Sequence, residues 1–227
     1  ISDLRILVLH FIFPFLPDKS ESTTKYLGTH GHNIIQNDLK LILNNDIPEI
    51  SDDLIRWVNF LSLKKYESWF EMKDACTDIL FEAKESGDET NKLAASIIFG
   101  WFCRLKPSPS HNNHNIIEDT FVHCHLDVVL NEIFSSDPIF EQEWANGYLE
   151  SCKKENELIF KPDWAAFVRP WYTRFDIGVC EVKPPGKKNV GVYSDYVKMG
   201  LEMKNMLNCL VKEGVDDAQV FGILVVG

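Results

Sequence analysis

Two carboxylates and a lysine in the C-terminal half of the chain have the types and spacing for metal-assisted chemistry. The stretch Lys161–Pro185 reads KPDWAAFVRPWYTRFDIGVCEVKPP. Its apolar runs, Trp164–Val168 and Phe175–Glu181, flank a segment that holds a proline, which predicts a β-hairpin with a long loop. If the turn centres near residue 172, facing residues have index sums of about 344. Asp163 then falls opposite Glu181.

Strand alternation adds a cation to this pair of carboxylates. Lys183 lies two positions after Glu181 and therefore shares its face of the strand. Carboxylate oxygens suit Mg²⁺ or Mn²⁺, which can polarise a phosphoryl oxygen and lower the pKa of a bound water. A lysine ammonium can orient that water or offset phosphate charge. The structural alternative is that Asp163 caps a turn while Glu181 and Lys183 form a surface cross-strand pair.

The residues Pro162–Asp163 followed by Glu181–Val182–Lys183 resemble the motif of the PD-(D/E)XK nuclease superfamily, which is restriction-endonuclease-like. The resemblance covers residues 116–227. It implies a core of helix, three-stranded meander, helix and strand with a mixed sheet. It also implies that Asp163 and Glu181 hold the metal, that the Val182 backbone carbonyl joins them, and that Lys183 is catalytic.

The wider surroundings carry a finer resemblance. Trp144–Asn146 upstream and Glu202–Lys204 downstream look like segments of uncharacterised members of the superfamily from early-diverging fungi. This finer resemblance implies no substrate. Neither resemblance covers Ile1–Lys106, whose role stays open.

The resemblance also suggests auxiliary site residues. Glu118, in the first core helix, would be a further metal ligand, and Lys198 and Lys204, on the second core helix, would contact phosphates. The short basic loop at Lys187–Lys188 is another candidate contact to a nucleic-acid backbone. Each has a structural alternative: Glu118 can complement a helix dipole, Lys198 can pair with Glu202 on a solvated face, and the loop can simply be solvated.

Two other groups could bind ligands. His111, His114, His123, Cys124 and His125 could form a zinc site, but His123 and His125 are two apart on a predicted helix and point to different sides.

Trp171 and Tyr172, at the predicted hairpin tip beside Arg169 and Arg174, could stack on exposed bases. The alternative is an ordinary aromatic turn.

The charge distribution bears on the partner. The net charge is −11, which opposes phosphate binding, yet the segment Glu157–Glu213 holds nine Lys and Arg against seven Asp and Glu. Nucleic acid, with DNA favoured, is therefore the predicted partner, and metal-dependent phosphodiester hydrolysis the predicted function. The alternative is a non-catalytic effector module on the same fold, with the acidic N-terminal part binding a protein.

The cysteines and the apolar segments indicate an intracellular, nuclear or cytoplasmic protein. The six cysteines include no C-x-x-C pair, which favours free thiols in a reducing compartment. The apolar segment Leu4–Leu16 is too short to span a bilayer, so no membrane association is expected.

The expected fold class is α/β. A mainly helical part, residues 1–106, is followed by a linker at 107–115 and the nuclease-like core at 116–227. Predicted helices are Ser51–Tyr66, Ser68–Glu85, Thr90–Leu105, Ile116–Phe134 and Tyr193–Glu213. The run Val220–Val226 predicts a strand covered on both faces, and since the chain stops there, both ends are expected to be cut from a longer protein.

Overall fold

A computed structural model describes residues 3–10, 12, 22–43, 50–104, 122–144, 147–152, 161–183 and 194–226. The chain forms two compact units, which we describe separately. The sheet unit comprises the described residues of Ile1–Pro48, Gln142–Lys183 and Lys187–Val226, and the helical unit those of Glu49–Glu141.

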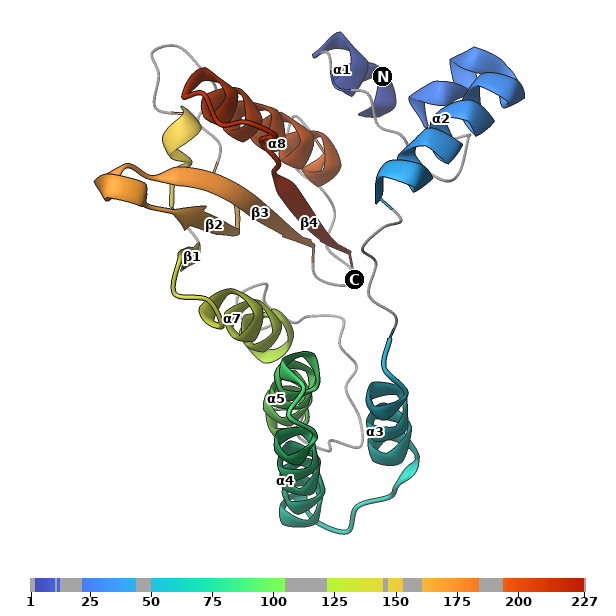
Figure 1. The fold of residues 1–227 in the computed structure, drawn as a ribbon, viewed down its shortest axis with the longest axis vertical. Coiled ribbons are helices and arrows are strands. Elements are labelled where there is room, and N and C mark those ends of the chain that lie inside the picture. The colour runs from blue at the N-terminus through green and yellow to red at the C-terminus, as the bar shows by residue number, and fades with distance from the viewer. Residues whose placement is uncertain are drawn as a thin grey trace. The chain divides into compact units, whose positions relative to one another are not determined.

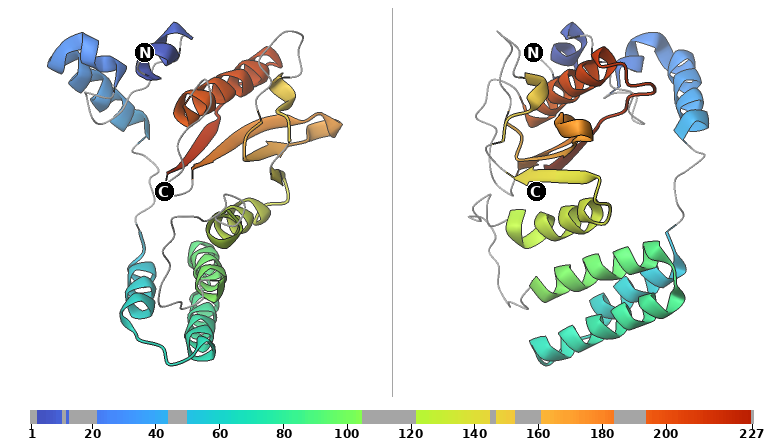
Figure 2. Two further views of the ribbon diagram at one scale, coloured as in Figure 1. Left: turned by 180° about the vertical axis from the view of Figure 1, so that it is seen from behind. Right: turned by 60° about the vertical axis from the view of Figure 1, so that its left-hand side comes forward.

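The sheet unit is built on a four-stranded mixed sheet. Its strands are β1 (Phe140–Trp144), β2 (Trp164–Val168), β3 (Phe175–Lys183) and β4 (Phe221–Val226), in the spatial order β1-β2-β3-β4. Strands β2 and β3 pair antiparallel, whereas β3 and β4 pair parallel. Helix α8 (Asp195–Lys212) makes the crossover between the two parallel strands and packs along one face of the sheet, as Figures 1 and 2 show.

The predicted hairpin is confirmed, including its register. Trp164 pairs with Cys180, and the index sum of 344 holds as far as Ala166. A bulge between Ala166 and Phe167 then reduces the sum by one. The turn is a short 3₁₀ segment, η4 (Pro170–Tyr172), in which the proline takes the first position. The register places Asp163, directly before β2, beside the C-terminal half of β3.

Helix α8 begins at a serine cap and buries a stripe against the sheet. The Ser194 hydroxyl accepts a hydrogen bond from the Val197 N–H at 3.2 Å. The buried stripe includes Glu202 and Met206, whereas the apolar side chains of Leu207 and Val211 are exposed. The core of this unit comprises Leu7, Leu149, Ala165, Val179, Val197, Leu201 and Met206.

The helical unit contains α3 (Asp52–Leu63), α4 (Trp69–Ser86), α5 (Glu89–Arg104), the π-helical turn η2 (Val122–Leu126) and α7 (Asp127–Ser135). Helices α3, α4 and α5 confirm the expected spans to within three residues at each end. Ser51 and Ser68 cap α3 and α4, and Gly87 ends α4 with a left-handed φ of 74°. The core comprises Trp57, Leu61, Ala75, Cys76, Ile79, Ala83, Ala95 and Ile98.

The chain does not divide at the linker that was expected at residues 107–115. The helical unit begins at Glu49 and extends to Glu141, and the sheet unit includes described residues of Ile1–Pro48. Helix α1 (Asp3–Leu9) belongs to the sheet unit because Leu7 is buried in its core and lies against Gly200 of α8, where a Cβ would approach Leu7 to 2.8 Å. Conversely, α7 packs against α5 in the helical unit. The helix expected at Ile116–Phe134 therefore joins, in its described part, the helical unit.

Three further elements complete the description. The N-terminal part also contains η1 (Thr23–Leu27) and α2 (Gly28–Leu43), and η3 (Glu150–Cys152) precedes β2. Strand β4 is half-buried at the edge of the sheet, not covered on both faces as expected.

The fold class is thus α/β with mostly helical content. Among the described helices, none has the length and apolarity to cross a membrane.

Candidate functional site

Asp163 and Glu181 lie side by side at the open end of the hairpin. The Asp163 N–H donates to the Cys180 carbonyl at 3.1 Å, and the Val182 N–H donates to Asp163 Oδ2 at 2.7 Å. Glu181 is only 3% exposed, in a strand flanked by β2 and β4. Because Ala165 and Val179 pack against α8, strand alternation directs Asp163 and Glu181 to the same face. The expected juxtaposition of the two carboxylates is confirmed.

Lys198 of α8 reaches into this pair of carboxylates. Its amine lies 2.6 Å from Glu181 Oε1 and donates to the Lys161 carbonyl at 2.7 Å. Although burial alone would lower the pKa of Lys198, the hydrogen bond and charge of Glu181 raise it above the ordinary value. The amine expected to contact phosphate is therefore engaged within the site in this structure.

Lys183 shares the face of Glu181, as predicted. Its amine pairs with Asp195 Oδ2 at 3.1 Å, in the first turn of α8, and both side chains are 21% exposed. The proposed surface pair of Glu181 with Lys183 is wrong, because Glu181 is buried and its cation is Lys198.

Glu202 is a third acid at this site, and the sequence reasoning gave it no role there. Its side chain is fully buried, and its nearest cation, the Lys198 amine, lies 3.9 Å from Oε1. Neither carboxylate oxygen of Glu202 accepts a hydrogen bond from a described residue. The alternative that Lys198 pairs with Glu202 is therefore confirmed as a 3.9 Å ion pair, but its expected place on a solvated face is wrong, because Glu202 is buried. The sequence signal that could have indicated this burial is the spacing of Lys198, Glu202 and Met206. They lie four residues apart and therefore on one side of the helix.

These residues form an electrostatically unbalanced group, which we call the carboxylate cluster: Asp163, Glu181, Asp195 and Glu202 with Lys183 and Lys198. Within this group four carboxyl groups meet two ammonium groups, a formal charge of −2 when every carboxyl group is ionised. Burial raises the pKa of Asp163, although the Val182 N–H opposes that shift. Burial raises the pKa of Glu181 to about 7, against the Lys198 charge. Burial and the Glu181 charge together raise the pKa of Glu202 to about 9.

The donor set fits a hard divalent cation in composition. Carboxylate oxygens are the ligands that such ions prefer, and a divalent cation would balance the charge of −2 that the fully ionised group has. The Glu202 oxygens accept no hydrogen bond from a described residue. The side chains are not arranged around an ion, however. Within the described part of the chain, no three His, Cys, Asp or Glu side chains are placed to hold a metal as they stand. The Lys198 amine against Glu181 is the side chain that would have to move.

The arginines of the hairpin do not belong to the carboxylate cluster. Arg174 donates to Asp176 Oδ1 at 2.7 Å and to Glu143 Oε2 at 2.6 Å. Asp176 also accepts hydrogen bonds from the backbone N–H groups of Glu150 and Ser151, at 2.6 and 3.4 Å. Among the ion pairs of the described residues, none joins an arginine to Asp163 or Glu181.

The other expected contacts lie elsewhere. The Lys204 amine donates to the His10 carbonyl at 2.7 Å and lines an apolar groove of about 480 Å³ that contains no residue of the carboxylate cluster. Glu118, the Lys187–Lys188 loop, His111 and His114 lie outside the described residues. The Val182 carbonyl as a ligand stays a prediction.

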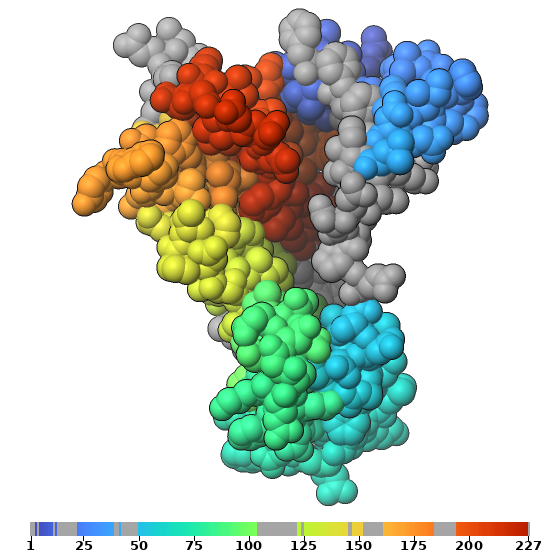
Figure 3. Space-filling view, in the orientation of Figure 1, coloured from blue at the N-terminus to red at the C-terminus, as the bar shows by residue number. Residues whose placement is uncertain are grey.

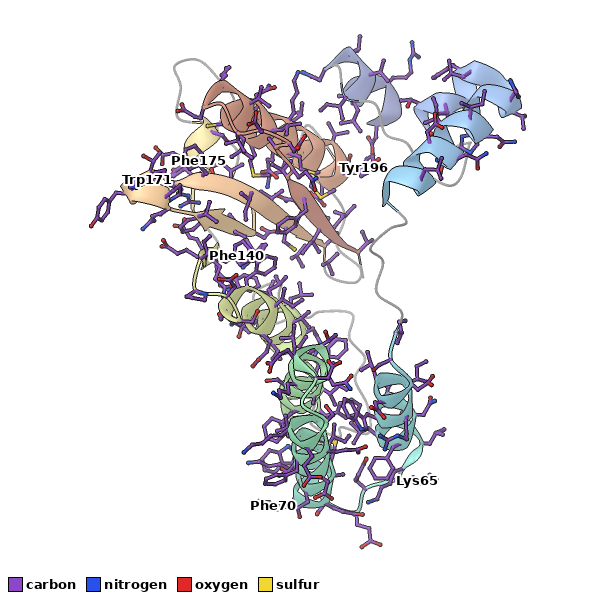
Figure 4. All side chains as sticks on the ribbon, viewed as in Figure 1. Lys65, Phe70, Phe140, Trp171, Phe175 and Tyr196 are labelled. Atoms are coloured by element: carbon purple, nitrogen blue, oxygen red, sulfur yellow. The ribbon has the colours of Figure 1, made fainter. Side chains whose placement is uncertain are left out.

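The hairpin tip exposes two aromatic side chains. Trp171 is 92% and Tyr172 99% exposed, and both adopt left-handed backbone angles, with φ of 49° and 69°. Figure 4 shows Trp171 extending from the end of the hairpin, and the orange tip protrudes in the space-filling view (Figure 3). Bulky residues in this conformation are uncommon. Base stacking at the tip stays a prediction.

Comparisons with protein-family models, with curated proteins and with solved structures find no match to this chain.

Proposed function

We propose that the protein is a metal-dependent nuclease that hydrolyses phosphodiester bonds in DNA, on a restriction-endonuclease-like core formed by β1 to β4 and α8. The single observation that carries the proposal is the buried, negatively unbalanced carboxylate cluster. Asp163 and Glu181 face each other across two strands, and Lys183 follows on the same face. Burying more carboxyl groups than ammonium groups makes it costly to ionise all of the acids, so a cluster of this kind favours a cation as its partner.

Mg²⁺ or Mn²⁺ would be held by Asp163 and Glu181. When bound, such an ion polarises a phosphoryl oxygen and lowers the pKa of a coordinated water. The Val182 N–H fixes Asp163 through the 2.7 Å hydrogen bond, which leaves the other carboxylate oxygen of Asp163 for the cation. This positioning by the backbone keeps the ligand in one rotamer without a competing positive charge.

Lys183 acts on the substrate side of the site. Its amine is held by Asp195 at 3.1 Å, and its side chain is 21% exposed, so Lys183 reaches solvent while it remains beside Glu181. An ammonium group in this position can orient the attacking water and offset charge that develops on the phosphate. Asp195 is then a positioning residue that sets the direction of the Lys183 side chain.

A DNA-cleavage assay tests the proposal. Supercoiled plasmid and single-stranded DNA are incubated with the full chain in Mg²⁺ or Mn²⁺, and the wild type is compared with Asp163→Asn and Lys183→Ala. We expect cleavage that EDTA stops and a loss of at least about a hundredfold in each variant, since each removes a group acting on the transition state. Arg56→Ala, in the helical unit, is the matched surface control and should cut like the wild type.

A non-catalytic binding module is the second candidate function, because the Lys198 amine already pairs with Glu181 at 2.6 Å. In that case, Lys198 is a permanent partner and the cluster serves stability alone. Metal-independent DNA or protein binding without cleavage, unchanged in Asp163→Asn, would favour this function and contradict the nuclease proposal.

A further inference from the structure

Glu202 is the buried group that the proposed catalytic residues leave without a role. Helix α8 supplies it from the side of the site opposite the hairpin, whereas Asp163 and Glu181 come from the sheet. Glu202 is completely buried, and no described residue donates a hydrogen bond to either of its oxygens. A buried carboxyl group normally has such donors, so their absence points to a ligand.

The surroundings of Glu202 identify the kind of ligand. Its neighbours are the Lys198 amine, 3.9 Å away, and the carboxylate of Glu181, whose charge acts directly on it. A neutral or anionic ligand would leave the excess of carboxylates uncompensated. An oxygen-preferring divalent cation would balance the formal charge of the cluster and use the free oxygens of Glu202 as donors.

We propose that Glu202 is a third carboxylate ligand of a divalent cation bound with Asp163 and Glu181, and that the Lys198 amine leaves Glu181 when the cation binds. The inference rests on the proposed metal site and extends it to α8. Lys198 occupies the space of the cation as an internal counter-ion, bonded to Glu181 and to the Lys161 carbonyl. The Lys198 side chain is 24% exposed in this structure, and its flexible stem is long enough to turn the displaced amine toward a substrate phosphate.

The displacement follows from charge. A divalent cation and an ammonium group cannot share the same carboxylate oxygens at close range without strong repulsion. Removing the Lys198 charge should therefore tighten cation binding, whereas removing the Glu202 charge should weaken it. These two opposite effects separate a ligand role of Glu202 from a purely structural one.

Calorimetric titration of the metal-free full chain with Mn²⁺ tests the proposal without any cleavage readout. We expect Glu202→Gln to weaken Mn²⁺ binding at least tenfold and Lys198→Met to strengthen it severalfold. Asp195→Asn is the matched control, because it makes the same acid-to-amide change in the same cluster but at a residue paired with Lys183. It should weaken binding less than threefold.

The outcomes are distinguishable. Equal weakening in Glu202→Gln and Asp195→Asn, with the circular dichroism spectrum unchanged, would show that Glu202 contributes charge only and overturn the proposal. Wild-type affinity in Glu202→Gln, or weaker binding in Lys198→Met, would also overturn it. If the wild type binds no Mn²⁺, both this inference and the nuclease proposal fail. Mn²⁺ binding that depends on Glu202, without DNA cleavage, would support the inference and reject the proposed function.

Discussion

Acidic side chains are buried at both ends of the β2–β3 hairpin, but the two ends differ in the hydrogen bonds that these side chains accept. At the tip end, Asp176 accepts hydrogen bonds from Arg174 and from two backbone N–H groups, and the second acid, Glu143, is 41% exposed. At the open end, Glu202 is buried without a hydrogen-bond donor among the described residues. Burial of charge alone therefore does not identify a functional site. The two ends differ in whether the buried acid has hydrogen-bond donors.

The difference has a clear physical basis. A guanidinium with rigid, planar donors compensates Asp176 permanently, so the protein completes that ion pair by itself. The carboxylate cluster has only flexible lysines, and they are outnumbered by carboxylates. We infer that the first cluster stabilises the hairpin and that the second is completed by a cation. The following predictions test this contrast.

The largest effect is expected for Arg174→Met. The substitution leaves Asp176 buried without its cation, which should lower the free energy of unfolding by about 3–5 kcal/mol. Urea unfolding followed by circular dichroism measures the change. Glu143→Gln, which alters the exposed partner, should cost less than about 1 kcal/mol. A loss below about 1 kcal/mol for Arg174→Met would mean that the tip cluster is not the structural one.

The pH dependence of stability should come from the carboxylate cluster. The pKa of Glu202 is raised to about 9 in the folded protein, above its ordinary value of 4.5, so the folded state keeps a proton that the unfolded state has released. The contribution of Glu202 to the stability of the metal-free protein is then fully present below about pH 4.5 and is lost as the pH rises toward 9, by up to about 1.4 kcal/mol per pH unit. Urea unfolding in EDTA at several pH values measures this slope.

Glu202→Gln is the matched variant for this pH series, because glutamine has the same shape and does not titrate. The decline should become shallower and end near pH 7, where Glu181 remains as the titrating group with its pKa raised to about 7. If the free energy of unfolding of Glu202→Gln has the same pH dependence as that of the wild type, Glu202 does not hold the proton. The proposed electrostatic difference between the two ends of the hairpin would then be wrong.

The smallest effect is expected at the hairpin tip. Tyr172 adopts a φ of 69°, which asparagine tolerates better than an aromatic residue does. Tyr172→Asn should therefore raise the free energy of unfolding by about 0.5–1 kcal/mol, measured by urea unfolding. Tyr172→Phe is the control and should leave stability unchanged, since the 99% exposed ring makes few contacts. A loss of stability in Tyr172→Asn would show that the exposed ring contributes to folding.

Much of the fold could be predicted because local signals and packing agree. Ser51, Ser68 and Gly87 mark helix ends by their capping chemistry, and the hairpin register followed from the apolar runs alone. Strand β1 was missed, because its sequence FEQEW is polar and it pairs at the edge of the sheet. Local propensity contains no information on such pairing.

The candidate site was predictable in part for the same reason. Asp163, Glu181 and Lys183 lie on two adjacent strands, so hairpin arithmetic brings them together. The burial of Glu202 and the inward direction of the Lys198 side chain depend on the rotation of α8 about its axis. That rotation buries Met206 and leaves Val211 exposed. That rotation is set by tertiary packing around Leu7 and Val197, residues far apart in the sequence.

The most direct test of the central claim is a crystal structure of the protein grown with Mn²⁺, with anomalous scattering used to locate the ion. The account predicts one strong peak bonded to carboxylate oxygens of Asp163, Glu181 and Glu202, with the Lys198 amine moved away from Glu181. A cluster that contains no peak, with Lys198 still bonded to Glu181 at saturating Mn²⁺, would contradict the account and leave the carboxylate cluster as a structural feature.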